Sequence, residues 1–424
     1  MEIKIIVGAN YGDEGKGLMT DYVCRRFLSK SPDKSVLNVM HNGGPQRGHT
    51  VQLEDGTRFT FRNLGAATFA GADTYMASMF LVNPATLREE LEQVRSMGYH
   101  PKVFINMGCR IITPYDMIAN QVTEEHYRRG SCGCGIWKTI QRNATIGFTV
   151  KDLIDNWESD FDEIIGNRVT NIQAHHRHKI ISGIGFNSGW YEVFNMPGIT
   201  DAFIEDMRWM LMDNDIFFMS SNRDDLRTMF GTRYECIIFE NAQGLAIDGK
   251  IVLGMEYNTP SDTDLINPTR IIENSGYQSS DIEVIFVSRT YLTRHGKGLF
   301  VYDEMNADDL SKKILINDPS NVENEWQGKL RHAPFDEYSF GEMIFRCNAA
   351  MQYMTANFRW HKSNICRSIA LTHYDELHLT DDAFDQLMNL KYSKVYISTG
   401  PAAIHIVEDE CSTNALKKAF DRLG

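Results

Sequence analysis

A lysine and two carboxylates lie within a glycine-rich loop near the start of the chain. The loop reads Gly12-Asp13-Glu14-Gly15-Lys16-Gly17. A glycine turn that opens a helix presents backbone N–H groups to phosphate, and the Lys16 ammonium group would add positive charge. A carboxylate in such a place repels phosphate unless it binds a metal ion or takes up a proton. We therefore predict a phosphate site in which Asp13 acts as a general base or a metal ligand.

This loop is not a Walker A motif, which would need glycine in place of Asn10 and serine or threonine in place of Gly17. A plain strand–turn–helix with a solvated pair of carboxylates is the structural alternative, since glycine turns are common.

A second glycine-rich loop carries a histidine. It reads His41-Asn42-Gly43-Gly44-Pro45-Gln46-Arg47-Gly48-His49-Thr50. An imidazole that faces a phosphate site can donate a hydrogen bond to a developing oxyanion. A loop histidine bonded only to backbone is the alternative, and the first loop favours the catalytic interpretation of His49.

Short apolar segments that precede these loops are typical of buried parallel strands. We expect strands at 3–7, 36–40, 103–105, 237–239, 282–287, 369–375 and 395–400, and a helix over 84–97 that begins near Pro84 and ends before Gly98. The recurrence of strand, glycine and helix predicts an α/β fold with a large, mainly parallel central sheet. With no linker or repeat in sight, we expect one domain over 1–424.

The composition excludes several classes of function. The net charge of −13 over 424 residues argues against nucleic-acid binding, and no apolar run is long enough to span a membrane. The chain enters a strand at once, so we see no signal peptide and expect a cytoplasmic protein. The eight cysteines include no Cys-x-x-Cys pair and are expected to be reduced thiols.

Two clusters of possible metal ligands receive a structural interpretation. Cys132-Gly133-Cys134 could be half of a metal site, but no partner pair is in sight. His175-His176-Arg177-His178 is interpreted as a solvated basic turn, within a segment whose aromatic and methionine pattern (Phe203, Met207, Met210 and Leu211) indicates core helices.

Further segments follow the two loops in a recognisable order. They are Gly130-Ser131-Cys132-Gly133-Cys134-Gly135-Ile136, Glu240-Asn241-Ala242-Gln243-Gly244, Thr259-Pro260-Ser261, Thr293-Arg294-His295-Gly296-Lys297-Gly298 and Leu371-Thr372-His373-Tyr374-Asp375. Together with Gly12 to Gly17 and Gly43 to Thr50, this series resembles the adenylosuccinate synthetase family along nearly the whole chain. The resemblance implies that family's large central sheet and a homodimer.

The resemblance also implies roles for individual residues. Asp13 would be the catalytic base, with His49 and Lys16 assisting, and Mg²⁺ would be held by Asp13 and the Gly48 carbonyl. Nucleotide and phosphate contacts would come from Gly12, Glu14, Gly15, Gly17, Gly48, Thr50, Asp375, Ser398 and Gly400. The purine substrate would meet Gln46, Ser131, Cys132, Gln243, Thr259 and Lys329, and L-aspartate would meet Arg331. Arg142 is the nearest candidate for the family arginine that reaches the partner subunit's site.

Several positions depart from the family pattern. Arg47 replaces a small residue, Cys132 a threonine, Lys329 an arginine and His373 a lysine. Asp375 is retained, and one carboxylate can accept hydrogen bonds from both N1–H and the 2-amino group of guanine, which favours GTP as the phosphoryl donor.

These observations predict an NTP-dependent C–N ligase that acts on a 6-oxopurine nucleotide. By resemblance it would join L-aspartate to IMP with GTP and form adenylosuccinate. A phage branch of the family, which converts dGMP with an adenine nucleotide (ATP or dATP) as donor, is the first alternative. A non-catalytic nucleotide-binding relative is the second, and retention of both Asp13 and His49 speaks against it.

Overall fold

The computed structural model describes residues 1–158, 160–185, 187–220, 222–251, 257–276, 281–300, 326–328, 330–358 and 364–410. None of the helices within these ranges is long and apolar enough to cross a bilayer.

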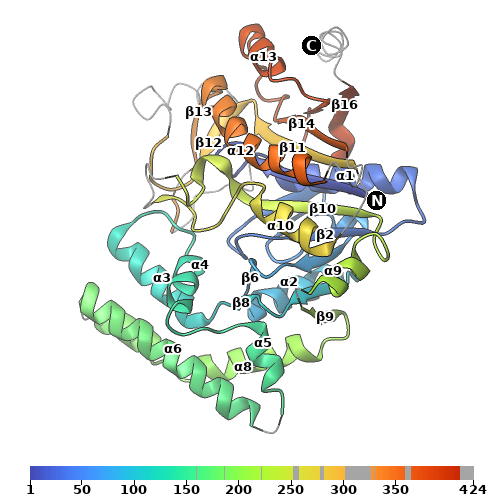
Figure 1. Cartoon of the computed structure of the whole chain (residues 1–424). Helices are drawn as coiled ribbons and strands as arrows, with labels where there is room; N and C mark the ends of the chain where they lie inside the picture. Colours follow the sequence, from blue (N-terminus) through green and yellow to red (C-terminus); the bar gives the residue numbers. More distant parts are fainter. Residues whose placement is uncertain are drawn as a thin grey trace.

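A ten-stranded sheet forms the centre of the molecule (Figure 1). In spatial order its strands are β16 (Ile406–Glu410), β15 (Lys394–Ser398), β14 (Asn364–Thr372), β11 (Asp281–Arg289), β1 (Glu2–Gly8), β10 (Cys236–Gly244), β2 (Val36–Met40), β5 (Asp73–Met76), β7 (Val103–Asn106) and β9 (Ile216–Met219). Neighbouring strands pair in parallel, except that β16 runs antiparallel to β15. The prediction of a large, mainly parallel sheet is confirmed, and each strand expected from the sequence belongs to it.

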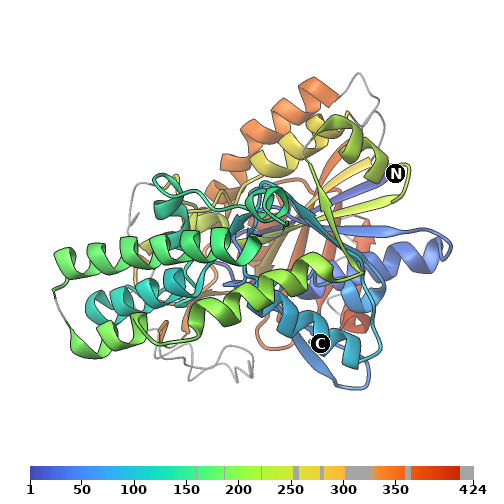
Figure 2. The ribbon, with the colours of Figure 1, turned by 90° about the horizontal axis from the view of Figure 1, so that it is seen from below.

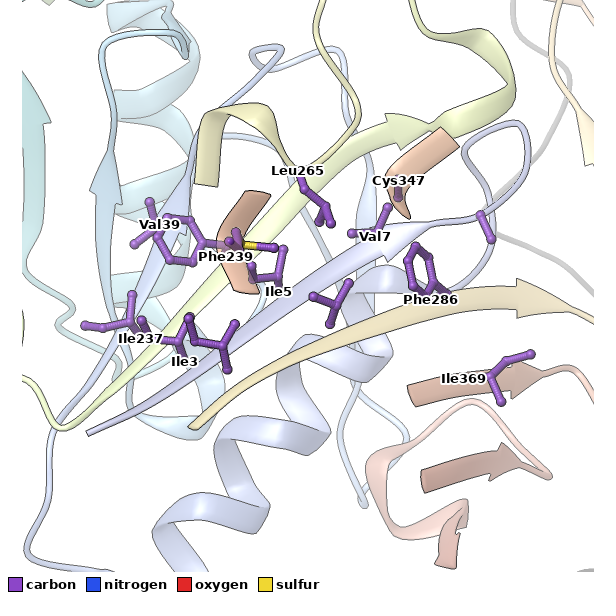
Figure 3. Packing of buried hydrophobic residues seen from close by; sticks show 14 of the residues in the cluster. Ile3, Ile5, Val7, Val39, Ile237, Phe239, Leu265, Phe286, Cys347 and Ile369 are labelled. Carbon is purple, nitrogen blue, oxygen red and sulfur yellow. The ribbon is translucent and has the colours of Figure 1, made fainter. Parts of the chain in front are cut away.

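β1 lies in the middle of this sheet because both of its faces are apolar. Ile3, Ile5 and Val7 pack against α10 (Ile266–Ser275) and α12 (Glu337–Phe358), together with residues of β10 (Figure 3). Ile6 points to the other face and packs against α1 (Lys16–Lys30). A strand that is buried on both sides must lie inside a sheet covered by helices, and its ends are therefore fixed in position.

Three two-stranded sheets lie beside the main sheet. They pair β3 (His49–Gln52) with β4 (Arg58–Phe61), β6 (Leu81–Val82) with β8 (Arg110–Ile111), and β12 (Tyr291–Arg294) with β13 (Arg331–Pro334). The first matters for function because β3 begins with His49, and the third because it places Arg331 opposite Arg294.

Other helices pack beyond β5 and β7 or around the sheet (Figure 1). Their bounds are α2 (Pro84–Ser96), α3 (Pro114–Tyr127), α4 (Ile136–Asn143), α5 (Val150–Asp155), α6 (Phe161–Gly183), α7 (Ser188–Phe194), α8 (Ile199–Met212), α9 (Arg223–Met229) and α13 (Asp381–Met388), with short 3₁₀ turns η1 (Thr68–Ala70), η2 (Leu245–Ile247) and η5 (Ala403–His405). The long helix α6 packs against α3 and α8 (Figure 2).

The ends of α2 follow from its sequence. The side chain of Asn83 caps the helix by accepting hydrogen bonds from the N–H groups of Ala85 and Thr86, and Pro84 occupies the first helical position. Gly98, with a φ of 88°, follows the last turn. The predicted helix over 84–97 is thus observed over Pro84–Ser96.

The expectation for the histidine cluster was wrong. His175 to His178 lie within α6 rather than in a turn, and His176 is buried. Its Nε2 lies 2.8 Å from Oδ1 of Asp116 on α3, so a hydrogen-bonding contact with a buried carboxylate holds this histidine inside the helical layer. The expected core positions Phe203, Met207 and Met210 are buried on α8.

Candidate active site

The loops at the carboxyl ends of six neighbouring strands surround one cavity of about 900 Å³. The carboxyl edge of a parallel sheet is where α/β proteins usually bind ligands. Most residues singled out from the sequence line this cavity. They are Gly12, Asp13, Gly15, Lys16, Gly17, Gln46, Gly48, His49, Thr50, Ser131, Cys132, Gln243, Thr259, Asp375, Ser398 and Gly400.

The loop after β1 is folded around the side chain of Glu14. Glu14 accepts hydrogen bonds from the N–H groups of Asn10 at 3.0 Å and Gly12 at 2.7 Å. The Lys16 ammonium group donates to Glu14 at 2.7 Å and to the carbonyl of Gly12 at 2.5 Å. Glu14 therefore lies behind the loop, where it organises the backbone, while Lys16 lines the cavity at the start of α1.

Gly17 allows the two glycine-rich loops to approach each other. A Cβ at this position would lie 3.0 Å from the backbone carbon and the Cβ of His49 and 3.1 Å from the carbonyl oxygen of Thr50. Because glycine leaves this space open, α1 packs directly against β3 and brings His49 beside the first loop.

Asp13 faces the cavity among positively charged side chains. Its Oδ2 lies 4.0 Å from Nε2 of His295, and its backbone carbonyl accepts a hydrogen bond from Nε of Arg289 at 2.5 Å. Burial raises the pKa of the Asp13 carboxyl, and the charges of His295, Arg289 and Lys16 oppose this effect. A carboxyl group with a raised pKa is suited to accept a proton from a ligand.

His49 is held by a carboxylate from a neighbouring strand. Its Nδ1 lies 2.5 Å from Oε1 of Glu240, which is fully buried on β10. Burial lowers the pKa of His49 to about 4, although the charge of Glu240 opposes this shift. For Glu240, burial acts to raise the pKa, but Arg47 and His49 outweigh it and bring the pKa to about 2. An ionised Glu240 keeps a proton on Nδ1 of His49. The other ring nitrogen, Nε2, is then available to contact a ligand.

The loop before α4 is pinned at both ends by one asparagine. Nδ2 of Asn120 donates to the Ser131 hydroxyl at 2.7 Å, and the Gly135 N–H donates to Oδ1 of Asn120 at 3.0 Å. Cys132 lies between these two points and lines the cavity. Among the described residues, no group of three or more histidine, cysteine or acidic side chains is arranged to hold a metal ion.

The residues at and after the ends of β14 and β15 also line the cavity. Asp375 is exposed to the cavity after a left-handed residue, His373, with a φ of 58°. Ser398 donates to the Gly400 carbonyl at 2.6 Å. The Thr372 hydroxyl donates to the carbonyl of Glu14 at 2.7 Å, so the end of β14 is tied to the first loop.

Three predicted residues lie elsewhere or outside the described ranges. Glu14 is behind its loop, and Lys329 falls outside the described residues. Nη2 of Arg331 donates to the Gly298 carbonyl at 3.0 Å, and its guanidinium lies over the ring of Phe300. Its strand partner Arg294 lines the cavity.

The structure contradicts the role considered for Arg142. This side chain is fully buried, with Nε 2.8 Å from Oδ1 of Asp116 and Nη2 3.0 Å from Oδ2. An arginine held inside its own subunit by a buried carboxylate cannot extend into a partner's site.

Sequence reasoning missed the parts played by Glu240, Arg289 and His295. Glu240 was noticed only as part of a matching segment, and Arg289 was not singled out. A charged residue at the carboxyl end of a buried strand was the available signal for both, because such residues emerge at the ligand-binding edge. His295 had no comparable signal.

Comparison with known proteins identifies the family. The family model for adenylosuccinate synthetase matches residues 5–315. The chain belongs to the adenylosuccinate synthetase family. Among curated members, the adenylosuccinate synthetase of Acaryochloris marina is 25% identical over 322 residues, which cover 72% of this chain and 64% of that protein. The Lactobacillus acidophilus enzyme is 27% identical over 313 residues, covering 70% and 63%. The chain thus spans less than two thirds of the length of these relatives.

Two solved structures share the fold. Fully ligated adenylosuccinate synthetase from Plasmodium falciparum aligns with a TM-score of 0.65 at 16% identity, covering 97% of this chain and 100% of that one. The succinoaminodeoxyadenylate synthetase of cyanophage S-2L, bound to dGMP and to dATP as an energy donor, aligns with a TM-score of 0.60 at 14% identity, covering 99% of each chain. At these identities the likeness concerns the fold alone.

Proposed function

We propose that this protein is a ligase that uses GTP to join L-aspartate to C6 of IMP, forming adenylosuccinate. One observation carries the proposal: Asp13 and His49, from two different loops, line the same cavity together with Lys16. A carboxylate and an imidazole that share a phosphate-binding cavity are the pair required to activate the oxygen of a lactam.

The chemical problem is that the 6-oxo group of a purine is a poor leaving group. Asp13 takes the proton from N1, so that negative charge reaches O6. O6 then attacks the γ-phosphorus of GTP, and GDP leaves. Lys16 stabilises the charge on the transferring group, together with His49 once the negative charge of the bound phosphates raises its pKa and Nε2 takes up a proton. The amine of aspartate attacks C6, the C6–O bond breaks, and inorganic phosphate leaves with the oxygen and with the proton that the amine releases.

The unpaired amide of Gln46 supports recognition of a polar ligand. Both the nitrogen and the oxygen of this side chain are buried, and neither has a hydrogen-bond partner among the described residues. Gln46 lines the cavity and is followed two residues later by Gly48. A buried amide without partners costs free energy, which a purine or phosphate group would recover on binding.

Asp375 supports a guanine-bearing donor. Its carboxylate is exposed and lines the cavity, as do Ser398 and Gly400. It can accept from N1–H and the 2-amino group together, and adenine offers neither.

The residues around Asp13 fit a nucleotide-bound Mg²⁺ ion. Mg²⁺ in such sites takes one or two protein oxygens and completes its shell with phosphate and water. The Asp13 carboxylate and the Gly48 carbonyl, which both line the cavity, would hold it. Its charge would neutralise the phosphates during transfer.

L-Aspartate is proposed to bind near the β12–β13 pair. Arg331 and Arg294 face each other across this pair, and guanidinium groups match carboxylates in a bidentate manner.

We further propose that the protein acts as a homodimer, as the family resemblance implies.

A second candidate substrate is dGMP with an adenine nucleotide as donor. Arg47 and Cys132, which depart from the family pattern, lie in the two loops that would meet the substrate. Trp326 packs against Gly133, in the same loop as Cys132. Guanine shares the 6-oxo group and N1–H with hypoxanthine, so the Asp13 and His49 chemistry applies to both.

A phosphate-release assay distinguishes these proposals. IMP, GMP and dGMP are each tested with GTP and ATP, with and without L-aspartate. Release that requires IMP, GTP and aspartate supports the first candidate, whereas release that requires dGMP and ATP supports the second. No release with any combination contradicts both and favours a nucleotide-binding relative without turnover.

A further inference from the structure

We propose that Arg47 is a positioning residue that fixes the imidazole of His49 for phosphoryl transfer by holding Glu240 in place. This inference rests on the proposed function, because it assigns His49 to the transferring phosphoryl group.

Arg47 is a fully buried guanidinium on the loop between β2 and β3. Its Nε donates to the carbonyl of Arg62 at 2.9 Å, and its Nη2 donates to the carbonyl of Leu64. Its Nη1 lies 3.4 Å from Oε2 of Glu240 and 3.3 Å from Nδ1 of His49. Two nitrogens therefore anchor the side chain to backbone, and the third faces the Glu240–His49 pair.

The backbone that anchors Arg47 is itself held by a second buried carboxylate. Glu90 on α2 accepts hydrogen bonds from the N–H groups of Arg62 at 3.1 Å, Asn63 at 2.8 Å and Leu64 at 2.9 Å. The support of Arg47 thus extends to a helix of the scaffold, which gives its guanidinium a fixed direction.

Both carboxylate oxygens of Glu240 have partners. Oε1 accepts from Nδ1 of His49, while Oε2 accepts from the N–H of Ala66 at 3.0 Å and faces Arg47. Removing Arg47 would leave a buried carboxylate without its strongest charge partner, which is costly. The carboxylate would then turn or take up a proton, and the orientation of His49 would loosen. A displacement of about 1 Å in a catalytic group can cost a factor of roughly 100 in rate.

The chain contains a matched cluster away from the cavity. Arg142, Asp116 and His176 form a second fully or nearly fully buried arginine–carboxylate–histidine group, and none of the three lines the cavity. A change at Arg142 thus controls for the general cost of removing a buried, paired arginine.

The test is a double-mutant cycle on phosphate release. Arg47→Met is made in the wild-type and His49→Asn backgrounds, and Arg142→Met in the same two. We expect Arg47→Met to lower kcat by about 10- to 100-fold, to leave KM for both nucleotides within about threefold, and to change kcat less than about twofold once His49 is absent. Arg142→Met should change kcat by the same factor in both backgrounds.

A second readout does not depend on turnover. The Nδ1 proton of His49 should give a strongly downfield NMR signal, assigned by its loss in His49→Asn. We expect this signal to shift or vanish in Arg47→Met and to persist in Arg142→Met. If Arg47→Met fails to fold, Arg47→Lys, which keeps the charge but cannot make all three contacts, is measured in the same cycle with the same expected pattern.

Each outcome has a defined meaning. An unchanged kcat in the Arg47 variant, an equal effect of that variant in both backgrounds, or an unperturbed Nδ1 signal would overturn the inference. A fully active His49→Asn protein would instead overturn the proposed role of His49, and with it the proposed function, while the NMR result would still report on the contact itself.

Discussion

At the scale of a single residue, a change at Asp13 should affect catalysis much more than nucleotide binding. Replacing it with asparagine keeps its size but removes the carboxylate that is proposed to accept a proton from N1. We expect Asp13→Asn to lower kcat by roughly 100-fold or more, while the dissociation constants of the nucleotides, measured by calorimetry with and without Mg²⁺, change far less. Turnover at the wild-type rate in this variant would contradict the role of Asp13.

Asp375 should decide which donor base is preferred. The variant Asp375→Asn loses the carboxylate that would accept two hydrogen bonds from guanine. We expect kcat/KM for GTP to fall about 10- to 100-fold, with little change for ATP, in parallel assays at saturating second substrate. An equal loss for both donors would show that Asp375 does not contact the base.

The cavity-lining residues were predictable where they lie next to glycines in the sequence. The spacing of Gly12, Gly15 and Gly17 around Asp13 and Lys16 is enough to single out this loop from the sequence alone, and all five residues line the cavity. Glu240 was not assigned a role because its partner His49 lies 191 positions earlier in the chain. Only the packing of β10 beside β2 brings the two together.

At the scale of elements, the group formed by α3, α4 and α6 should respond to pH. Burial acts to raise the pKa of Asp116, but His176 and Arg142 outweigh it and lower the pKa to about 2, compared with 3.8 in an unfolded chain. A carboxyl whose pKa is lower in the folded state adds stability above its unfolded pKa, and this contribution is lost as the pH falls toward 2.

The variant Asp116→Asn tests this group. We expect it to reduce the free energy of unfolding by about 3 kcal/mol at pH 7, because Arg142 would keep a buried charge without its anion. The difference between wild type and variant in urea unfolding should shrink as the pH falls from 5 to 2. Asp155→Asn, which removes an exposed ion pair with Lys151, is the control and should change stability by less than about 1 kcal/mol.

Elements with local end signals were predictable, and those fixed by tertiary contacts were not. Pro84 and Gly98 marked the limits of α2. By contrast, the four residues from His175 to His178 resemble a solvated turn in the sequence. Nothing in the local sequence shows that His176 will be buried in contact with Asp116, which lies 60 positions earlier. β10 likewise extends through polar residues to Gly244, further than its apolar core suggests.

At the scale of the whole molecule, ligand binding should protect distant segments together. The cavity joins loops that follow β1, β2, β10, β11, β14 and β15, which come from both ends of the chain. We expect a donor and a substrate nucleotide, added together at about 100 times their dissociation constants, to slow hydrogen exchange in 9–15, 41–48 and 372–376 at the same time. Binding alone should add about 2.7 kcal/mol per nucleotide to stability. Protection confined to one loop would contradict a shared site.

The order of strands was beyond sequence reasoning. Apolar runs indicated which segments form the sheet, but β1 lies between β10 and β11, whose sequence positions are more than 220 residues away. Such neighbours are chosen by the packing of α1 on one face and of α10 and α12 on the other.

The hydrogen bond from Thr372 to the backbone of Glu14 has a consequence for how this protein could diversify. It fastens the segment that would read the donor base to the loop that would cradle the triphosphate, just before His373. If the donor binds as proposed, a substitution at Asp375 would change the side chain that meets the base while this hydrogen bond still holds the cradle. Donor preference would then be a trait that evolution could alter with few substitutions and without rebuilding the proposed catalytic centre.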